Sequence, residues 1–172
     1  MEEMRIDIVD GFILPDELHK IEKLIVDLTW NPFEGDVYET KTYPSGISAE
    51  LEGEIREILD ERVIEQAYTL TSTKLRISRA YVNGWKPNEI SFPHKDMVHT
   101  TCLIYLNRKY DRKYGGETLF YDETGDAHYA ITPTPMRAVF FDGWIEHKAT
   151  SFNHLFMGGY RHTIAYKLVE EE

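Results

Sequence analysis

Two residues in the segment Pro93-His94-Lys95-Asp96 have the types and spacing to bind one metal ion. Residues two positions apart in an extended segment point to the same side, so His94 and Asp96 would offer an imidazole and a carboxylate together. His147, which follows a predicted strand and a turn, could add a second imidazole. Two histidines and one carboxylate form the facial triad that leaves positions open on non-haem Fe(II), although the same ligands also suit Mn, Co, Ni and Zn. Because H-x-D is short and arises by chance, a surface turn is the alternative interpretation.

A second pair of residues could bind an organic anion. Arg161 and Thr163 lie two residues apart near the start of the last predicted strand and therefore share one face. A guanidinium can hold a carboxylate through two parallel hydrogen bonds, and a hydroxyl beside it can add another. A surface salt bridge is the alternative. Ile164 and Tyr166 occupy the other face of this strand, and the pattern does not indicate which face is inward.

The elements that must position these side chains divide the sequence into a helical half and a β-rich half. We predict a strand at 6–12 and helices at 15–28 and 48–71, where apolar residues recur every three or four positions. The strands predicted after the second helix are 74–82, 100–107, 117–121, 137–142 and 160–169. This order favours an α+β fold, with the helices packed on one side of an antiparallel sandwich or barrel.

Composition limits the class of protein. A chain of 172 residues with 42% hydrophobic residues is typical of one folded domain. The net charge of −11 repels phosphate backbones, so nucleic acid is not an expected partner. The single cysteine, Cys102, excludes a cysteine-clustered metal site and fits a reducing compartment. No apolar run approaches the roughly 20 residues of a membrane helix, and the N-terminus lacks the layout of a signal peptide. We therefore expect a cytoplasmic protein with no membrane partner.

The motifs of the β-rich half, taken in order, resemble those of the Fe(II)- and 2-oxoglutarate-dependent dioxygenases, in particular the prolyl 4-hydroxylase-like branch. The resemblance covers roughly residues 74–169. The matching segments are Pro93-His94-Lys95-Asp96, the strand ending Tyr105-Leu106-Asn107, Gly115-Gly116-Glu117-Thr118, the strand 137–142, His147 and Arg161-His162-Thr163. The resemblance implies a double-stranded β-helix, or jelly-roll, core at about 73–169. Helical support at about 1–72 would complete a single domain over 1–172.

The resemblance also implies roles for individual residues. The implied iron ligands are His94, Asp96 and His147. The implied partners of the distal carboxylate of 2-oxoglutarate are Arg161, with Tyr105 and Thr163 as helpers. Tyr81 and Asn83 match segments that line the cosubstrate or substrate pocket.

The distal histidine has a competitor. The gap between His147 and Arg161 is longer than the family commonly shows, and His154 lies in the enlarged loop. His147 is favoured because it follows a strand and a turn, as the family's distal ligand does, whereas His154 lacks this lead-in.

By the same resemblance, the protein would use Fe(II), 2-oxoglutarate and O2 to hydroxylate an unactivated C–H bond, releasing succinate and CO2. The family branch favours a prolyl residue in a peptide or protein, or a free amino acid or other small molecule. One alternative is a cupin-like metalloenzyme that does not use 2-oxoglutarate, and which would have no use for the carboxylate-binding residues. The other is a non-catalytic binding module on the same fold, which would not need both groups of residues. The sequence does not indicate an oligomeric state.

Overall fold

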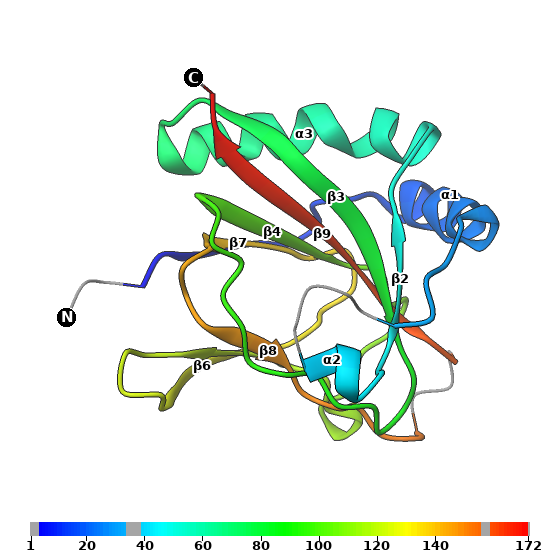
Figure 1. Ribbon diagram of the computed structural model, residues 1–172. Helices are drawn as coiled ribbons and strands as arrows, with labels where there is room; N and C mark the ends of the chain where they lie inside the picture. Colours follow the sequence, from blue (N-terminus) through cyan, green and yellow to red (C-terminus); the bar gives the residue numbers. More distant parts are fainter. Residues whose placement is uncertain (1–3, 34–38, 156–158, 172) are drawn as a thin grey trace.

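The computed structural model describes residues 4–33, 39–155 and 159–171. Within them the strands form two antiparallel sheets that face each other (Figure 1). The larger sheet has the order β1-β7-β4-β9-β3-β2, and the smaller has the order β6-β5-β8. The strands are β1 (Ile6–Val9), β2 (Ile47–Glu50), β3 (Leu75–Trp85), β4 (Thr100–Tyr105), β5 (Thr118–Tyr121), β6 (Ala127–Ile131), β7 (Ala138–Asp142), β8 (His147–Ala149) and β9 (Arg161–Glu170). Two facing antiparallel sheets are the arrangement expected of a double-stranded β-helix.

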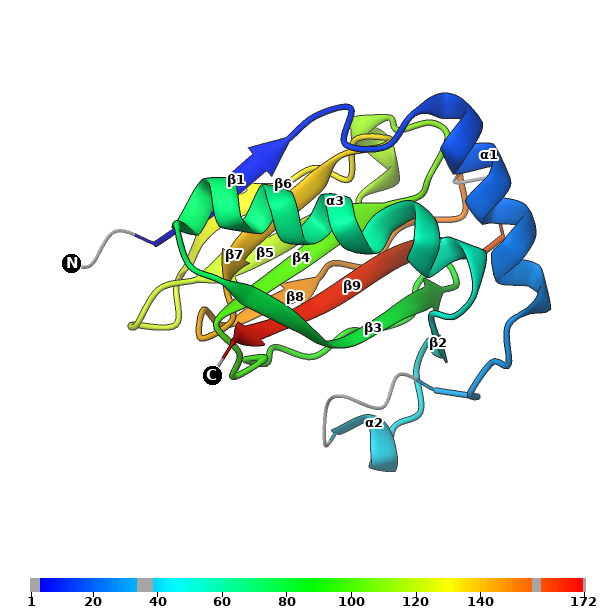
Figure 2. The same cartoon turned by 90° about the horizontal axis from the view of Figure 1, so that it is seen from above.

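The helices cover the outer face of the larger sheet, as predicted. Helix α1 (Pro15–Leu24) continues into a 3-10 turn at Ile25–Asp27, and α3 (Glu54–Thr71) is the longest helix described. Seen from above, α3 runs across the strands of the larger sheet, while β8 and β6 lie on the far side (Figure 2). Two shorter helical segments, α2 (Glu39–Thr42) and a 3-10 turn at Arg112–Tyr114, lie in the connections.

Helix α3 is held against the sheet by one apolar stripe. Ile55, Leu59 and Val63 recur every four residues and are all essentially inaccessible to solvent. Fully burying a side chain of this size contributes about 1.5 to 3 kcal/mol to stability. The same core contains Ile164 and Tyr166, from the face of β9 that is turned toward the helices.

Strand β9 has two buried faces, which resolves the ambiguity of the sequence pattern. Ile164 and Tyr166 pack in the core shared with the helices. Arg161, Thr163 and Lys167 point the other way, toward a pocket that residues of the smaller sheet also line. The alternation therefore places the candidate anion-binding residues between the two sheets.

The first strand ends at Val9, earlier than the 6–12 expected, and the start expected for the second helix is wrong. The second helix begins at Glu54 and not near Ser48, because Ser48 belongs to β2 and pairs with β3. Gly53 precedes the helix with a φ of 55°, a left-handed conformation that suits glycine and turns the chain. Leu51 has the spacing of the helix stripe and is buried in the same core, but it lies before the helix.

The five strands predicted in the β-rich half are present within a few residues of their expected ends. The structure adds three strands that were not predicted, namely β2, β6 and β8. In the part of the chain that the structure describes, no helix combines the length and the apolar character needed to cross a membrane.

Candidate active site

Two chain segments bring the H-x-D motif and the distal histidine together. His94 lies in the connection between β3 and β4, and His147 begins β8. Their backbones form an antiparallel bridge, in which each amide donates to the other carbonyl oxygen at 3.0 Å. The Asp96 amide donates to the carbonyl oxygen of Gly143 at 2.9 Å. These backbone contacts fix the motif against the turn that precedes His147.

The three side chains converge on one point. The His94 Nε2 atom lies 3.5 Å from Asp96 Oδ1, and the His147 Nε2 atom lies 3.6 Å from Asp96 Oδ2. One ligand atom from each residue falls within 4.8 Å of the others, and this is the group of possible metal ligands found among the described residues. Two nitrogen donors and one oxygen donor on one side of an ion suit Fe(II) and leave its other positions open.

Hydrogen bonds fix the histidine tautomers in the form that binds metal. The Nδ1 atom of His94 lies 3.0 Å from the Phe92 carbonyl oxygen, and that of His147 lies 3.0 Å from the Ile145 carbonyl oxygen. A carbonyl oxygen can only accept, so Nδ1 must carry the proton in both rings. When the ring is neutral, each Nε2 atom then keeps its lone pair and faces Asp96, as a metal ligand requires.

Asp96 is buried, and both of its oxygens have partners. Thr101 donates its hydroxyl to Oδ2 at 2.5 Å, and the Lys167 ammonium lies 2.5 Å from Oδ1. Burial by itself would raise the pKa of Asp96, but the hydrogen bond with His94 and the charge of Lys167 outweigh it and hold the pKa well below its usual range. Asp96 is therefore an anionic donor at neutral pH.

The two histidines have pKa values shifted in opposite directions. Burial lowers the pKa of His147 to about 4, so this ring is neutral at physiological pH. Burial also acts to lower the pKa of His94, but its hydrogen bond to Asp96 outweighs that effect and raises the pKa.

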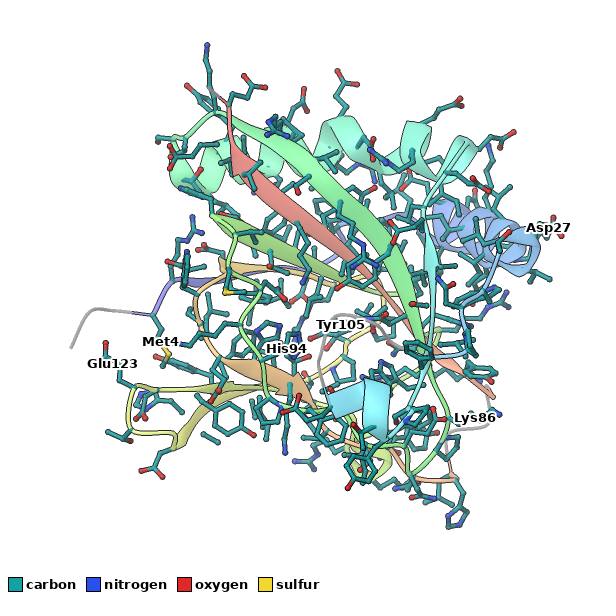
Figure 3. The ribbon with its side chains drawn as sticks, viewed as in Figure 1. Met4, Asp27, Lys86, His94, Tyr105 and Glu123 are labelled. Carbon is teal, nitrogen blue, oxygen red and sulfur yellow. The ribbon has the colours of Figure 1, made fainter. Side chains whose placement is uncertain are left out.

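The candidate anion-binding residues line a small pocket next to the triad. This pocket, of about 60 Å³, is lined by His94 and His147 as well as by Arg161 and Thr163 from β9. Figure 3 shows His94 and Tyr105 in the interior between the layers, whereas Asp27 and Glu123 lie at the edge of the molecule. The metal-ligating group and the anion-binding group therefore share one site.

Arg161 is the most unusual residue of this pocket. Its side chain is buried and donates to the carbonyl oxygen of Gly116, and the guanidinium lies 5.7 Å from the Phe152 ring. In the described part of the chain no carboxylate lies within ion-pair distance of it. Glycine suits position 116, because its φ is 88° and a Cβ atom there would lie 2.5 Å from Arg161 Nη1.

Three polar atoms of the pocket have no hydrogen-bond partner in the described structure. They are Arg161 Nε, Thr163 Oγ1 and Asn83 Oδ1. A buried polar group without a partner costs about 1 to 3 kcal/mol. Their convergence on one pocket beside a buried cation fits a site built for a carboxylate with further polar atoms.

Tyr105 reaches this pocket through Thr118. Its buried hydroxyl lies 2.7 Å from the Thr118 hydroxyl, and Thr118 lines the pocket. Burial raises the pKa of Tyr105, so the hydroxyl keeps its proton and can donate. Tyr81 and Asn83 also line the pocket. His154, the competing ligand, is exposed in the loop before β9 and is not in the metal-ligating group.

Sequence reasoning did not identify Lys167, Thr101 or Gly116 as parts of the site. The signal for Lys167 was available, because it alternates along β9 on the same face as Arg161. The contact of Thr101 with Asp96 depends on how β4 packs and has no signature in the sequence.

Comparison with known proteins agrees with this geometry. Residues 79–166 match the 2OG-Fe(II) oxygenase superfamily. An oxidoreductase of the 2OG-Fe(II) oxygenase family from Burkholderia pseudomallei has a similar structure, with a TM-score of 0.75 at 14% identity over 96% of this chain and 84% of that one. A Trichoplax adhaerens prolyl hydroxylase, in complex with a hypoxia inducible factor peptide fragment, gives 0.74 at 15% identity over 96% and 83%.

A third similar structure contains a small molecule. HygX from Streptomyces hygroscopicus, with nickel, 2-oxoglutarate and hygromycin B bound, gives a TM-score of 0.74 at 10% identity over 97% of this chain and 83% of that one. No curated protein sequence matches the chain. The family match covers half of the chain, including the triad and the residues of the pocket apart from Lys167. The chain belongs to the 2OG-Fe(II) oxygenase superfamily, and its cofactors are Fe(II) and 2-oxoglutarate.

Proposed function

We propose that His94, Asp96 and His147 hold Fe(II), and that Arg161, Thr163 and Tyr105 bind the distal carboxylate of 2-oxoglutarate. The observation that carries this assignment is the buried Arg161, which lies in the same pocket as the triad without a carboxylate partner among the described residues. A guanidinium in such a place needs an anion, and 2-oxoglutarate supplies one. The match to the superfamily favours this assignment over the alternative of a cupin-like enzyme that does not use this cosubstrate.

The residues of the site have separate tasks. The two neutral Nε2 atoms and the Asp96 carboxylate provide the ligands, while the Phe92 and Ile145 carbonyls keep the rings oriented. The iron centre, when bound, supplies the oxidation by O2 that is coupled to decarboxylation of 2-oxoglutarate to succinate and CO2.

An apolar wall lies behind His147. Phe120, Val139 and Phe141 are buried and form the cluster between the two sheets, beside His147. Such a wall strengthens the electrostatic contacts of the cosubstrate and limits side reactions with water.

We further propose that the reaction is hydroxylation of an unactivated C–H bond, with a prolyl residue of a peptide or protein as the first candidate. This proposal is supported by the likeness to a prolyl hydroxylase that binds a peptide fragment. A small-molecule substrate, such as a free amino acid, is the second candidate, supported by the likeness to HygX with hygromycin B.

The test measures succinate from 2-oxoglutarate with Fe(II) and air. Proline-containing peptides, free proline and matched peptides with alanine in place of proline are compared. We expect proline-dependent succinate and a product heavier by one oxygen atom, both absent in Asp96→Ala. Succinate stimulated equally by the alanine peptides would reject prolyl hydroxylation. Absence of succinate under every condition, with folded and metal-loaded protein, would reject the proposed reaction.

A further inference from the structure

A second buried cation lies in the pocket. Lys167 is only 8% exposed, and its ammonium contacts Asp96 Oδ1 at 2.5 Å and lies 5.6 Å from the centre of the Tyr81 ring. Buried ammonium groups are rare unless an anion compensates them. Asp96 provides one such contact, but this carboxylate is also the candidate metal ligand and shares its charge with the ion when one is bound.

Lys167 and Arg161 occupy opposite ends of one strand face. Both project from β9 toward the same pocket, with Thr163 and Ala165 between them in the alternation. Lys167 lies at the end of this face that is next to the triad, where it contacts Asp96. Arg161 lies at the other end, where it contacts Gly116. A pocket with a buried cation at each end matches a ligand with a carboxylate at each end.

The charges of the site support the same conclusion. Glu117 is half-buried and accepts a hydrogen bond from the Tyr110 hydroxyl at 2.8 Å. Its negative charge acts to raise the pKa of the Arg161 guanidinium. The positive charges of Fe(II), Arg161 and Lys167 are then matched by the negative charges of Asp96, Glu117 and a 2-oxoglutarate dianion. Without Lys167 the occupied site would contain an excess of buried negative charge, which is costly.

We propose that Lys167 is the cationic anchor for the carboxylate next to the 2-oxo group, while Arg161 anchors the distal carboxylate. This inference rests on the proposed function of the site. It gives Lys167 a role in binding any 2-oxo acid, and it limits the role of Arg161 to acids that have a second carboxylate. The alternative is that Lys167 only holds Asp96 in position, a task that Thr101 performs on the other oxygen.

The experiment compares two acids on the Fe(II)-loaded protein without oxygen. 2-Oxoglutarate has both carboxylates, and pyruvate lacks the distal one. Binding is followed by the visible charge-transfer band of a chelated 2-oxo acid, at saturating Fe(II). Lys167→Met should weaken both acids by about 10- to 100-fold, the effect of losing a hydrogen bond to a charged group. Arg161→Met should weaken 2-oxoglutarate and leave pyruvate unchanged.

Three further variants separate charge from position. Lys167→Arg keeps the cation and should restore most of the affinity for both acids. Thr101→Val removes the other hydrogen bond to Asp96. If Lys167 acts only by positioning Asp96, this variant should bind the two acids as weakly as Lys167→Met does. Lys148→Met changes a lysine on β8 that lies next to His147 but outside the lining of the pocket, and it should bind both acids normally.

The outcomes distinguish this inference from the proposed function. The assignment of Lys167 as an anchor is wrong if Lys167→Met binds both acids with wild-type affinity, or if its affinity falls for 2-oxoglutarate but not for pyruvate. The assignment of the iron and 2-oxoglutarate site would still stand. The anchor assignment is also wrong if Lys167→Arg is as weak as Lys167→Met, or if Thr101→Val matches Lys167→Met. Lys167→Gln decides between the same outcomes if the methionine variant does not fold. If the wild type gives no band with either acid, the proposed function itself fails.

Discussion

Replacing Arg161 with methionine should stabilise the ligand-free protein and abolish its response to 2-oxoglutarate. The guanidinium is buried, its Nε atom has no hydrogen-bond partner, and no carboxylate of the described chain pairs with it. The free energy cost of removing this charge from water therefore destabilises the folded state. Burial acts to lower the pKa of Arg161, which reflects the same cost. Methionine fills a similar volume without a charge.

The magnitude follows from two opposing changes. Removing a buried donor that has no partner stabilises the folded state by about 1 to 3 kcal/mol, and losing the hydrogen bond to Gly116 costs about 1 kcal/mol. We expect a net gain of up to about 2 kcal/mol in the free energy of unfolding, or up to roughly 8 °C in Tm. At 100 times its Kd, 2-oxoglutarate should stabilise the wild type by about 2.7 kcal/mol. If the variant binds two to three orders of magnitude more weakly, the same concentration stabilises it by about 0.4 kcal/mol or less.

The assay is thermal and urea denaturation of the metal-loaded protein with and without 2-oxoglutarate. Arg137→Met is the matched control, because Arg137 already has its carboxylate partner in Asp10 at 2.7 Å. This control should lose stability and keep the full response to 2-oxoglutarate. An Arg161→Met protein that is less stable than the wild type and still stabilised by 2-oxoglutarate would refute the reasoning, because the guanidinium would then have a structural role.

Three other expectations follow from the structure. His147→Ala should lose bound metal in elemental analysis while His154→Ala keeps it, because only His147 faces Asp96; the reverse pattern would move the distal ligand to the loop. Tyr105→Phe should weaken 2-oxoglutarate binding by about tenfold or less with metal content unchanged, since one neutral hydrogen bond contributes about 0.5 to 1.5 kcal/mol; a loss of metal would contradict this. Burial lowers the pKa of His162 to about 4. Between pH 6.5 and 4 the unfolded chain therefore binds a proton at this residue that the folded chain does not bind. The free energy of unfolding should fall as the pH falls through this range. His162→Phe should reduce that fall by about 2 to 3 kcal/mol in urea titrations at each pH, and an unchanged pH dependence would show that His162 is not responsible.

The β-rich half could be predicted because its strands combine β-branched and aromatic residues with clear turns. The start of the second helix could not, because Leu51 and Ile55 have helical spacing although the short connection at 51–53, with its turn at Gly53, separates β2 from α3. Strand β6 was missed because it has only five residues, two of them alanine, and is too short for a clear alternating pattern.

The candidate site was predictable in its residue types but not in its contacts. The H-x-D motif and the residues of β9 are visible in the sequence because they depend on local spacing. The bridge between His94 and His147, and the contact of Lys167 with Asp96, join segments far apart in the chain. Such contacts depend on how the sheets pack, so no local pattern reveals them.

The most direct test of the account is an anaerobic titration of the Fe(II)-loaded wild type with 2-oxoglutarate, followed in the visible range. The account predicts a weak charge-transfer band that saturates at one cosubstrate per chain and is absent in Asp96→Ala, which lacks the carboxylate ligand. A folded, Fe(II)-loaded wild type without the band, or an Asp96→Ala protein that retains it, would contradict the assignment of His94, Asp96 and His147 as the iron site.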